Sequence, residues 1–257
     1  MPKYTGRKAV VVGGTTGVGL AIAKRLVEGG ARTLLTGGAA HGIADVEGQL
    51  GPAASLVACD LFAADAVADF ASAAGSAFGT VDMLFVDAEP AASKPWAEPG
   101  AVSGTGHHDG RFTAAARGAY TAAQALAPLV ADEGAIVFTT VAADVCRPGT
   151  PDAGVRAMTA SAVHALTRVL AVELADRGVR VNAVSPGAID TPADALAHTP
   201  RPEAAPPLGR RGSVDEVARA ALFLATDATF TTGTVLAVDG GLGCGGGRPG
   251  PRPAPRD

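Results

Sequence analysis

Tyrosine and lysine are scarce in this chain of 257 residues, which limits the proton-transfer chemistry available to it. The only tyrosines are Tyr4 and Tyr120, and no lysine follows Lys94. A catalytic pair of tyrosine and lysine is therefore excluded beyond residue 120, and proton transfer by that part of the chain would need other residue types.

Cysteine is nearly as rare, and its spacing excludes two kinds of site. Cys59, Cys146 and Cys244 are odd in number and far apart, whereas zinc sites and disulfide frameworks use closely spaced or paired cysteines. We therefore expect no metal site, and we predict a reducing, cytoplasmic environment.

Long apolar runs and clusters of positive charge are also absent. No run of about 18 apolar residues offers a membrane span. Residues 8–12 lead into a glycine turn, not into the cleavage site of a signal peptide. The net charge is -4 and there is no basic block, which disfavours nucleic acid as a partner. We expect the partner to be a small molecule, with no nucleic acid and no membrane.

Short β-branched runs alternate with helical stretches along the chain. This alternation predicts an α/β domain with a parallel, doubly wound sheet covered by helices on both faces. The capping-box pattern Ser213-x-x-Glu216 is expected to open a late helix. The predicted strands are residues 9–12, 33–36, 56–58, 83–86, 135–138, 180–184 and 235–238.

The glycine-rich segment from Gly13 to Gly19 follows the first predicted strand and opens a helix. Glycine permits a tight turn and lets the backbone approach a pyrophosphate, whose charge is favoured at a helix N-terminus. The order of strand, glycines and helix predicts a dinucleotide-shaped pocket; the alternative is a turn used only for packing.

From about residue 6 to residue 243 the chain resembles the short-chain dehydrogenase/reductase family. The resemblance rests on the Gly-x-x-x-Gly-x-Gly opening, the strand at 179–184, the run at 185–191 and the ending at 238–241. It implies a three-layer Rossmann fold with about seven parallel strands, as one domain over residues 1–244. The implied NAD(P)(H) contacts are Gly13, Thr15, Thr16, Gly17 and Gly19 in the turn, Asp60 at the adenine, and Pro186, Gly187, Ile189 and Thr191 beside the nicotinamide. Asp60 also fits a helix cap, and Pro186-Gly187 a simple strand-ending turn.

The catalytic residues that the resemblance implies are replaced in this sequence. Family members use an asparagine, a serine, a tyrosine and a lysine, and the matching positions hold Ala115, Thr140, Arg156 and Ala160. The family's Asn-Asn-Ala-Gly segment reads Val86-Asp87-Ala88-Glu89. Arginine stays protonated and cannot act as a tuned proton donor. The loss of acid–base help is expected to slow ordinary ketone reduction about 10²- to 10⁴-fold.

The replacements suggest a polar catalytic site made of Thr140, Arg156, Glu89 and Asp87 at the carboxyl ends of the central strands. A carboxylate beside an arginine can abstract a proton while the guanidinium stabilises the resulting anion. The leading hypothesis is an atypical, non-redox enzyme, an isomerase, dehydratase or cyclase of specialised metabolism. The alternatives are an NAD(P)H-dependent ketoreductase with a non-standard proton donor and a catalytically inactive subunit partnering an active relative. A structural ion pair fits the same residues.

Several questions stay open at this point. Thr36-Gly37-Gly38 supplies neither the acid nor the arginine that would choose between NAD and NADP, and the cofactor could be unused.

The resemblance implies a homodimer or homotetramer, or a hetero-oligomer with an active relative, in contact through helices near 112–130 and 157–175. The Gly, Pro and Arg tail at 245–257 is predicted to be disordered. Trp96, His107, His108 and Cys146 receive no assigned role, and His164 is interpreted as a packing or interface residue.

Overall fold

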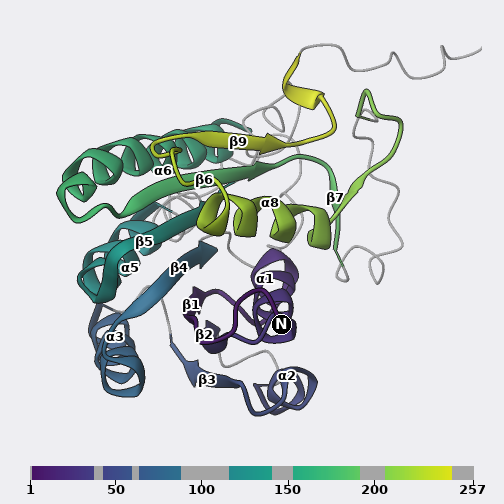
Figure 1. Ribbon diagram of the computed structural model, residues 1–257. Helices are drawn as coiled ribbons and strands as arrows, with labels where there is room; N and C mark the ends of the chain where they lie inside the picture. The colour runs from purple at the N-terminus through teal and green to yellow at the C-terminus, as the bar shows by residue number, and fades with distance from the viewer. Residues whose placement is uncertain are drawn as a thin grey trace, which may run out of the picture.

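A parallel sheet forms the centre of the protein (Figure 1). The computed structural model describes residues 2–37, 43–59, 64–87, 116–140, 153–191 and 206–244. The strand order is β3-β2-β1-β4-β5-β6-β9, and every neighbouring pair is parallel. The strands are β1 (Lys8–Val12), β2 (Arg32–Gly37), β3 (Ala54–Ala58), β4 (Val81–Asp87), β5 (Val130–Thr139), β6 (Arg180–Pro186) and β9 (Val235–Val238). The prediction of a doubly wound parallel sheet with about seven strands is confirmed.

The central strands are apolar on both faces because both faces are covered. In β1, Val11 packs into the core on one side of the sheet, while Val10 and Val12 pack into the core on the other. All three are fully buried. Successive side chains of a strand point to opposite faces, so a strand inside two layers reads as a continuous apolar run.

Helices form the two outer layers (Figure 1). One face of the sheet is covered by α1 (Gly17–Glu28), α2 (Ile43–Leu50) and α8 (Val214–Thr226). The other face is covered by α3 (Ala64–Phe78), α5 (Gly118–Leu126) and α6 (Ala153–Glu173). The three-layer Rossmann architecture expected from the sequence is therefore present.

The chain beyond β6 forms a second, small sheet at the carboxyl edge of the main one. β7 (Ile189–Asp190) pairs with β8 (Gly212–Ser213), and α8 begins directly after β8. The predicted capping box is confirmed, because the Ser213 hydroxyl accepts a hydrogen bond from the Glu216 N–H at 3.2 Å and the Glu216 carboxylate accepts one from the Ser213 N–H at 2.9 Å. Short 3-10 turns lie at Ala127–Leu129, Ala175–Arg177 and Leu242–Cys244.

The structure bears on only some of the remaining predictions. Among the helices it describes, none combines the length and apolar character needed to cross a bilayer. Cys59 is buried and Cys244 is exposed, whereas Cys146 lies outside the described residues. The tail at 245–257 also lies outside them, so its disorder stays a prediction.

Candidate active site

The turn between β1 and α1 brings backbone segments together so closely that a side chain has no room. A Cβ on Gly19 would lie 2.3 Å from the carbonyl oxygen of Gly13, and one on Gly13 would lie 2.5 Å from the carbonyl oxygen of Asp87. Gly13 and Gly17 also have positive φ angles of 79° and 53°, which favour glycine. The turn therefore requires glycine where the sequence predicts phosphate contacts.

The N-terminus of α1 is suited to an anion such as a pyrophosphate. Thr16 is the N-cap residue, but its side chain makes no capping hydrogen bond, and the first turn carries no acidic residue of its own. The first N–H groups of a helix lack partners inside the helix and carry the positive end of its dipole. The glycine turn and this helix end fit the phosphates of a dinucleotide.

Asp87, at the end of β4, reaches this helix end with its side chain. Its Oδ2 atom accepts a hydrogen bond from the Gly19 N–H at 3.1 Å. A carboxylate there stabilises the helix dipole, although it also sets negative charge beside the expected phosphate position. The contact gives Asp87 a role at the cofactor turn that the sequence did not suggest, since we had placed it among the catalytic residues.

The end of β2 lies directly against the glycine turn. A Cβ on Gly37 would be 2.2 Å from the Thr15 hydroxyl oxygen, and the Gly14 N–H donates to the Thr36 carbonyl at 2.8 Å. Thr15 is itself buried. This packing explains why position 37 has no side chain, and Gly38 falls outside the described residues. Among the described residues at the end of β2, no acid or arginine is present that would distinguish NAD from NADP.

The expected nicotinamide side of the pocket is built from the end of β6 and from β7. The Gly187 N–H donates to the Val238 carbonyl at 3.0 Å, and a Cβ on Gly187 would lie 2.6 Å from the Cα atom of Asp239. Ile189 is buried, while Thr191, the last described residue before the gap, is half-buried. Together with Pro186, these residues occupy the carboxyl edge of the sheet, which is where open α/β sheets bind ligands.

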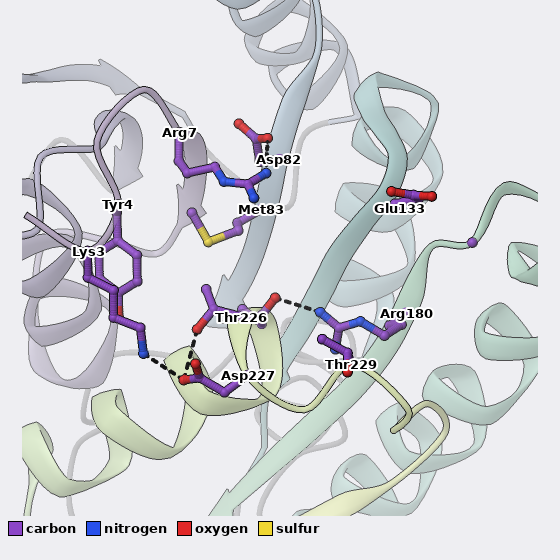
Figure 2. Close-up of a pocket in the computed structure, with 12 residues that line it drawn as sticks. Lys3, Tyr4, Arg7, Asp82, Met83, Glu133, Arg180, Thr226, Asp227 and Thr229 are labelled. Atoms are coloured by element: carbon purple, nitrogen blue, oxygen red, sulfur yellow. Dashed lines mark hydrogen bonds and ion pairs between the residues drawn. The ribbon is translucent and has the colours of Figure 1, made fainter.

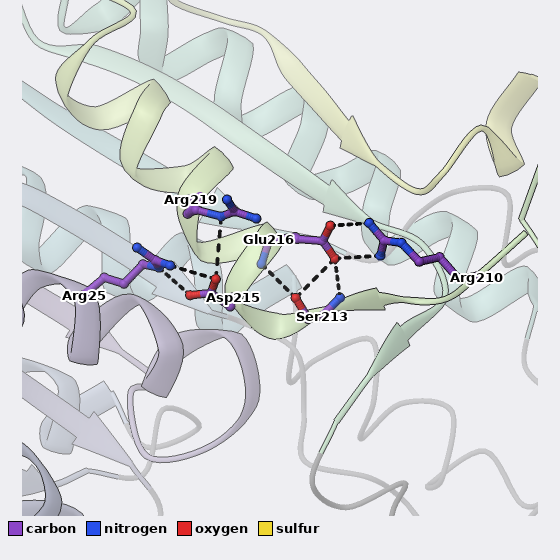
Figure 3. A network of polar contacts seen from close by, with 6 residues as sticks. All are labelled: Arg25, Arg210, Ser213, Asp215, Glu216 and Arg219. Atoms are coloured by element: carbon purple, nitrogen blue, oxygen red, sulfur yellow. Dashed lines mark hydrogen bonds and ion pairs between the residues drawn. The ribbon is translucent and has the colours of Figure 1, made fainter. Parts of the chain in front are cut away.

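Ion pairs fix the small sheet and the start of α8 (Figure 3). Arg210 contacts Glu216 through both terminal nitrogens, at 3.0 and 2.6 Å, and Arg25 of α1 pairs with Asp215 through Nε and, at 2.7 Å, through Nη2. The Arg210 guanidinium and the Ser213 N–H lower the pKa of Glu216 to about 2. The Arg210–Glu216 pair links the segment after β6 to α8, and the Arg25–Asp215 pair links α8 to α1.

Arg156 and Ala160 lie in the first half of α6. Arg156 is half-buried, whereas Ala160 is 1% exposed. Residues four apart lie on the same side of a helix, so the two positions share a face, as the family's tyrosine and lysine would. Arg156 contributes a positively charged guanidinium group, and Ala160 contributes only a methyl group.

Thr140 follows β5 and is held by its neighbours on both sides. Its N–H donates to the Val184 carbonyl at 2.9 Å, and its hydroxyl oxygen lies 3.3 Å from the same carbonyl. The hydroxyl oxygen also lies 3.1 Å from Nε2 of His164 on α6. Burial lowers the pKa of His164, and the positive charge of Arg168 lowers it further. An imidazole that is neutral at pH 7 therefore contacts the candidate catalytic hydroxyl.

The contact with His164 was not anticipated from the sequence, which suggested packing or an interface for this residue. The available signal was spacing, since His164 follows Ala160 by four residues and Arg156 by eight on one helix. The residues Glu89 and Asp60, together with Ala115, Trp96, His107, His108 and Cys146, lie outside the described residues, and their predicted roles stay predictions.

A depression of about 570 Å³ lies at the opposite, amino-terminal edge of the sheet (Figure 2). Its basic side chains already have protein partners. Lys3 pairs with Asp227 at 2.6 Å, Arg7 with Asp82 at 2.7 Å, and Arg180 donates to carbonyl groups at the end of α8. We therefore place the candidate site at the carboxyl edge.

The chain is similar to known proteins over almost its whole length. A family described as enoyl-(acyl carrier protein) reductase matches residues 12–243. An L-fucose dehydrogenase of Bos taurus is 35% identical over 99% of this chain and 96% of its own. A cis-4-hydroxycyclohexanecarboxylate dehydrogenase of Sinomonas cyclohexanicum is 35% identical over 93% of this chain and 97% of its own.

Solved structures agree with these sequence relatives. A short-chain dehydrogenase/reductase of Serratia marcescens has a TM-score of 0.79 at 28% identity, covering 93% of this chain and 99% of its own. A blue fluorescent protein from a metagenomic library, solved in complex with NADPH, has a TM-score of 0.81 at 29% identity, again covering 93% and 99%. Apart from the blue fluorescent protein, the named relatives are dehydrogenases or reductases. They do not support the non-redox enzyme that led our hypotheses, and they favour an oxidoreductase.

Proposed function

Because the chain belongs to the short-chain dehydrogenase/reductase family, we propose that it is an NAD(P)-dependent oxidoreductase that interconverts an alcohol and a carbonyl group of a small molecule. The observation that carries the proposal is the glycine turn. It is closed so tightly at Gly13 and Gly19 that neither position has room for a side chain, which leaves a backbone surface beside the Asp87 carboxylate at the N-terminus of α1. A backbone surface at a helix N-terminus is suited to a dinucleotide's phosphates.

The cofactor would be held by residues at the carboxyl edge of the sheet. Gly13, Gly17 and Gly19 would contact the phosphates, while Ile189 and Thr191 would lie beside the carboxamide. A bound nicotinamide supplies a hydride to a carbonyl carbon or accepts one from an alcohol carbon. The proposal covers both NAD and NADP, because Gly37 carries no side chain that would select between them.

The proton donor of this protein is non-standard, because Arg156 and Ala160 stand at the positions of the usual tyrosine and lysine. We propose that the Arg156 guanidinium stabilises negative charge on the substrate, either on the reacting oxygen or on a carboxylate substituent. The proton itself is supplied elsewhere, at or near Thr140. This assignment makes the chain a divergent family member rather than an ordinary ketoreductase.

The substrate class follows from the relatives' names taken together with Arg156. One relative is named for a sugar and the other for a hydroxylated cyclohexane carboxylate. We propose a small, hydroxylated and cyclic substrate, with preference for one that carries a carboxylate. The scarcity of cysteine pairs adds the inference of a reducing cytoplasm.

A catalytically inactive subunit is the second candidate. It is favoured by the simultaneous loss of the tyrosine and the lysine, and by exposed apolar side chains on α6 such as Met158 at 56% and Val172 at 77%. Such a chain would modulate an active relative through this helix, and it would transfer no hydride.

Hydride transfer is the test that separates these candidates. The full-length protein is supplied with NAD or NADP and a panel of hydroxylated cyclic compounds, including L-fucose and cis-4-hydroxycyclohexanecarboxylate, and reduced nicotinamide is followed by absorbance. Turnover that depends on enzyme and alcohol supports the proposal. Arg156→Gln should raise KM most for the carboxylate. If no compound in the panel transfers a hydride to NAD or NADP, and no corresponding ketone accepts one from NADH or NADPH, the oxidoreductase assignment fails and the inactive-subunit candidate takes its place.

A further inference from the structure

We infer that Thr140 and His164 form a proton-transfer pair, in which Thr140 contacts the substrate oxygen and His164, acting through Thr140, holds the proton. The inference deepens the proposed oxidoreductase function and rests on it. It is carried by the 3.1 Å separation between Thr140 Oγ1 and His164 Nε2, which joins the carboxyl edge of the sheet to α6.

The location of the pair suits such a role. Thr140 directly follows β5, one of the central strands, at the edge where the glycine turn and the end of β6 also lie. His164 is on the helix that carries Arg156 and Ala160, about 6 Å along the axis from Ala160. His164 is held by α6 and Thr140 by its backbone hydrogen bond to Val184 of β6, which limits how far either can move.

Two acceptors from the part of the chain that the structure describes lie within reach of the Thr140 hydroxyl proton. The hydroxyl can donate to the Val184 carbonyl at 3.3 Å or to Nε2 of His164 at 3.1 Å. The carbonyl already accepts the Thr140 N–H at 2.9 Å, and the 3.3 Å separation is long for a hydroxyl donor. We therefore assign the hydroxyl proton to the imidazole nitrogen in the resting protein.

The state of the imidazole is consistent with that assignment. Burial and Arg168 lower the pKa of His164, so the ring is neutral at pH 7 and one nitrogen carries a lone pair. Thr140 is 4% exposed, so water competes little for its hydroxyl. A neutral imidazole that accepts from a hydroxyl can take up a proton and return it.

The proton step is balanced within the pair. When an alcohol is oxidised, its O–H bond breaks and the proton forms a new O–H bond with Thr140 Oγ1. At the same time the original Thr140 O–H bond breaks and the proton binds Nε2, which leaves an imidazolium. Carbonyl reduction runs the same steps in reverse. Nothing is oxidised or reduced in this step.

The test compares His164→Gln with the wild-type protein. The Oε1 atom of glutamine can accept the Thr140 hydroxyl proton in place of imidazole Nε2, but the amide cannot take up a proton. If His164 handles the proton, kcat should fall by about 10²-fold, while the NADPH affinity and the melting temperature stay close to those of the wild type. Thr140→Val should cause a similar loss. The double variant should lose no more than either single variant, because the two residues act as a unit.

A readout without catalysis examines the pair itself. Histidine labelled with ¹³C at Cε1 gives one NMR signal for each of the five histidines, and His164→Gln identifies the signal of His164. Thr140→Val should shift that signal. Thr167→Val is the matched control, since the Thr167 hydroxyl is also buried but donates to the Val163 carbonyl at 2.8 Å. It should leave the signal in place.

The possible failures are distinguishable. If wild-type protein transfers hydride and His164→Gln retains its kcat, the contact is only structural and the inference is overturned while the proposed function stands. An unshifted signal in Thr140→Val overturns the pair by itself. If the wild-type protein binds cofactor but transfers no hydride, both the proposed function and the inference fall.

Discussion

At the scale of single residues, Asp87 combines a structural benefit with a cost for ligand binding. Its carboxylate accepts the Gly19 N–H at 3.1 Å and so satisfies a donor in the first turn of α1. The same negative charge would face the phosphates that the turn is proposed to hold. An asparagine would keep the hydrogen-bond acceptor and remove the charge.

We therefore predict that Asp87→Asn binds NADPH about two- to fivefold more tightly, since a charge at a helix end is worth about 0.3–1 kcal/mol. The free energy of unfolding should decrease by a similar amount, because the helix loses its favourable anion. Calorimetry measures the first quantity and urea unfolding the second.

Asp82→Asn provides the control, because Asp82 lies near the other end of β4 and pairs with Arg7 at 2.7 Å. Its NADPH affinity should equal that of the wild type. Weaker NADPH binding by Asp87→Asn would show that the carboxylate assists the cofactor site, contrary to this interpretation.

At the scale of secondary-structure elements, α8 and the small sheet depend on a charged cap. The pKa of Glu216 is lowered to about 2 by Arg210 first and by the Ser213 backbone and side chain next. A carboxyl group with a lowered pKa in the folded state stabilises that state above its unfolded pKa of 4.5, and the contribution is lost as the pH falls toward 2.

Glu216→Gln should accordingly melt below the wild type at pH 7, and the difference in melting temperature should shrink as the pH falls from about 4.5 toward about 2. Circular dichroism melts over this range measure it. Asp132→Asn is the control, because the Asp132 carboxylate is 75% exposed in its pair with Arg177, and such surface pairs contribute little. If the difference in melting temperature between Glu216→Gln and the wild type were constant from about pH 4.5 to about pH 2, the lowered pKa of Glu216 would not be its cause.

The sequence predicted the elements well and the contacts between them poorly. β-Branched runs located every strand of the main sheet, and Ser213 with Glu216 located the start of α8, because those signals are local. The contacts of Asp87 with Gly19 and of Thr140 with His164 join residues 68 and 24 positions apart. They depend on how layers pack, and the only local signal was the helical spacing of His164 from Arg156 and Ala160.

At the scale of the whole molecule, one outer layer leaves apolar side chains exposed. Tyr120 of α5 is 53% exposed, and on α6 Val169 is 51% and Val172 77% exposed. Exposed apolar patches on a helical layer commonly mark protein interfaces. We therefore propose that α5 and α6 form the contact between copies of this chain, or with a related subunit.

Val172→Glu should shift the protein toward monomer at micromolar concentration, because assembly would bury a charge without a partner. Light scattering coupled to gel filtration reports the mass. Gln49→Glu, which adds the same charge at an exposed position of α2, should leave the mass unchanged. An unchanged mass for Val172→Glu as well would place the interface elsewhere or show that the chain is monomeric.

The central claim is that the glycine turn holds a nicotinamide cofactor, and calorimetric titration of the full-length protein with NADPH tests it most directly. We predict micromolar binding by the wild type and by Gly48→Ala, whose added methyl group would meet nothing within 4 Å. Gly19→Ala should bind far more weakly, since its Cβ would lie 2.3 Å from the Gly13 carbonyl oxygen. No binding by the wild type at millimolar NADPH or NADH would contradict the account.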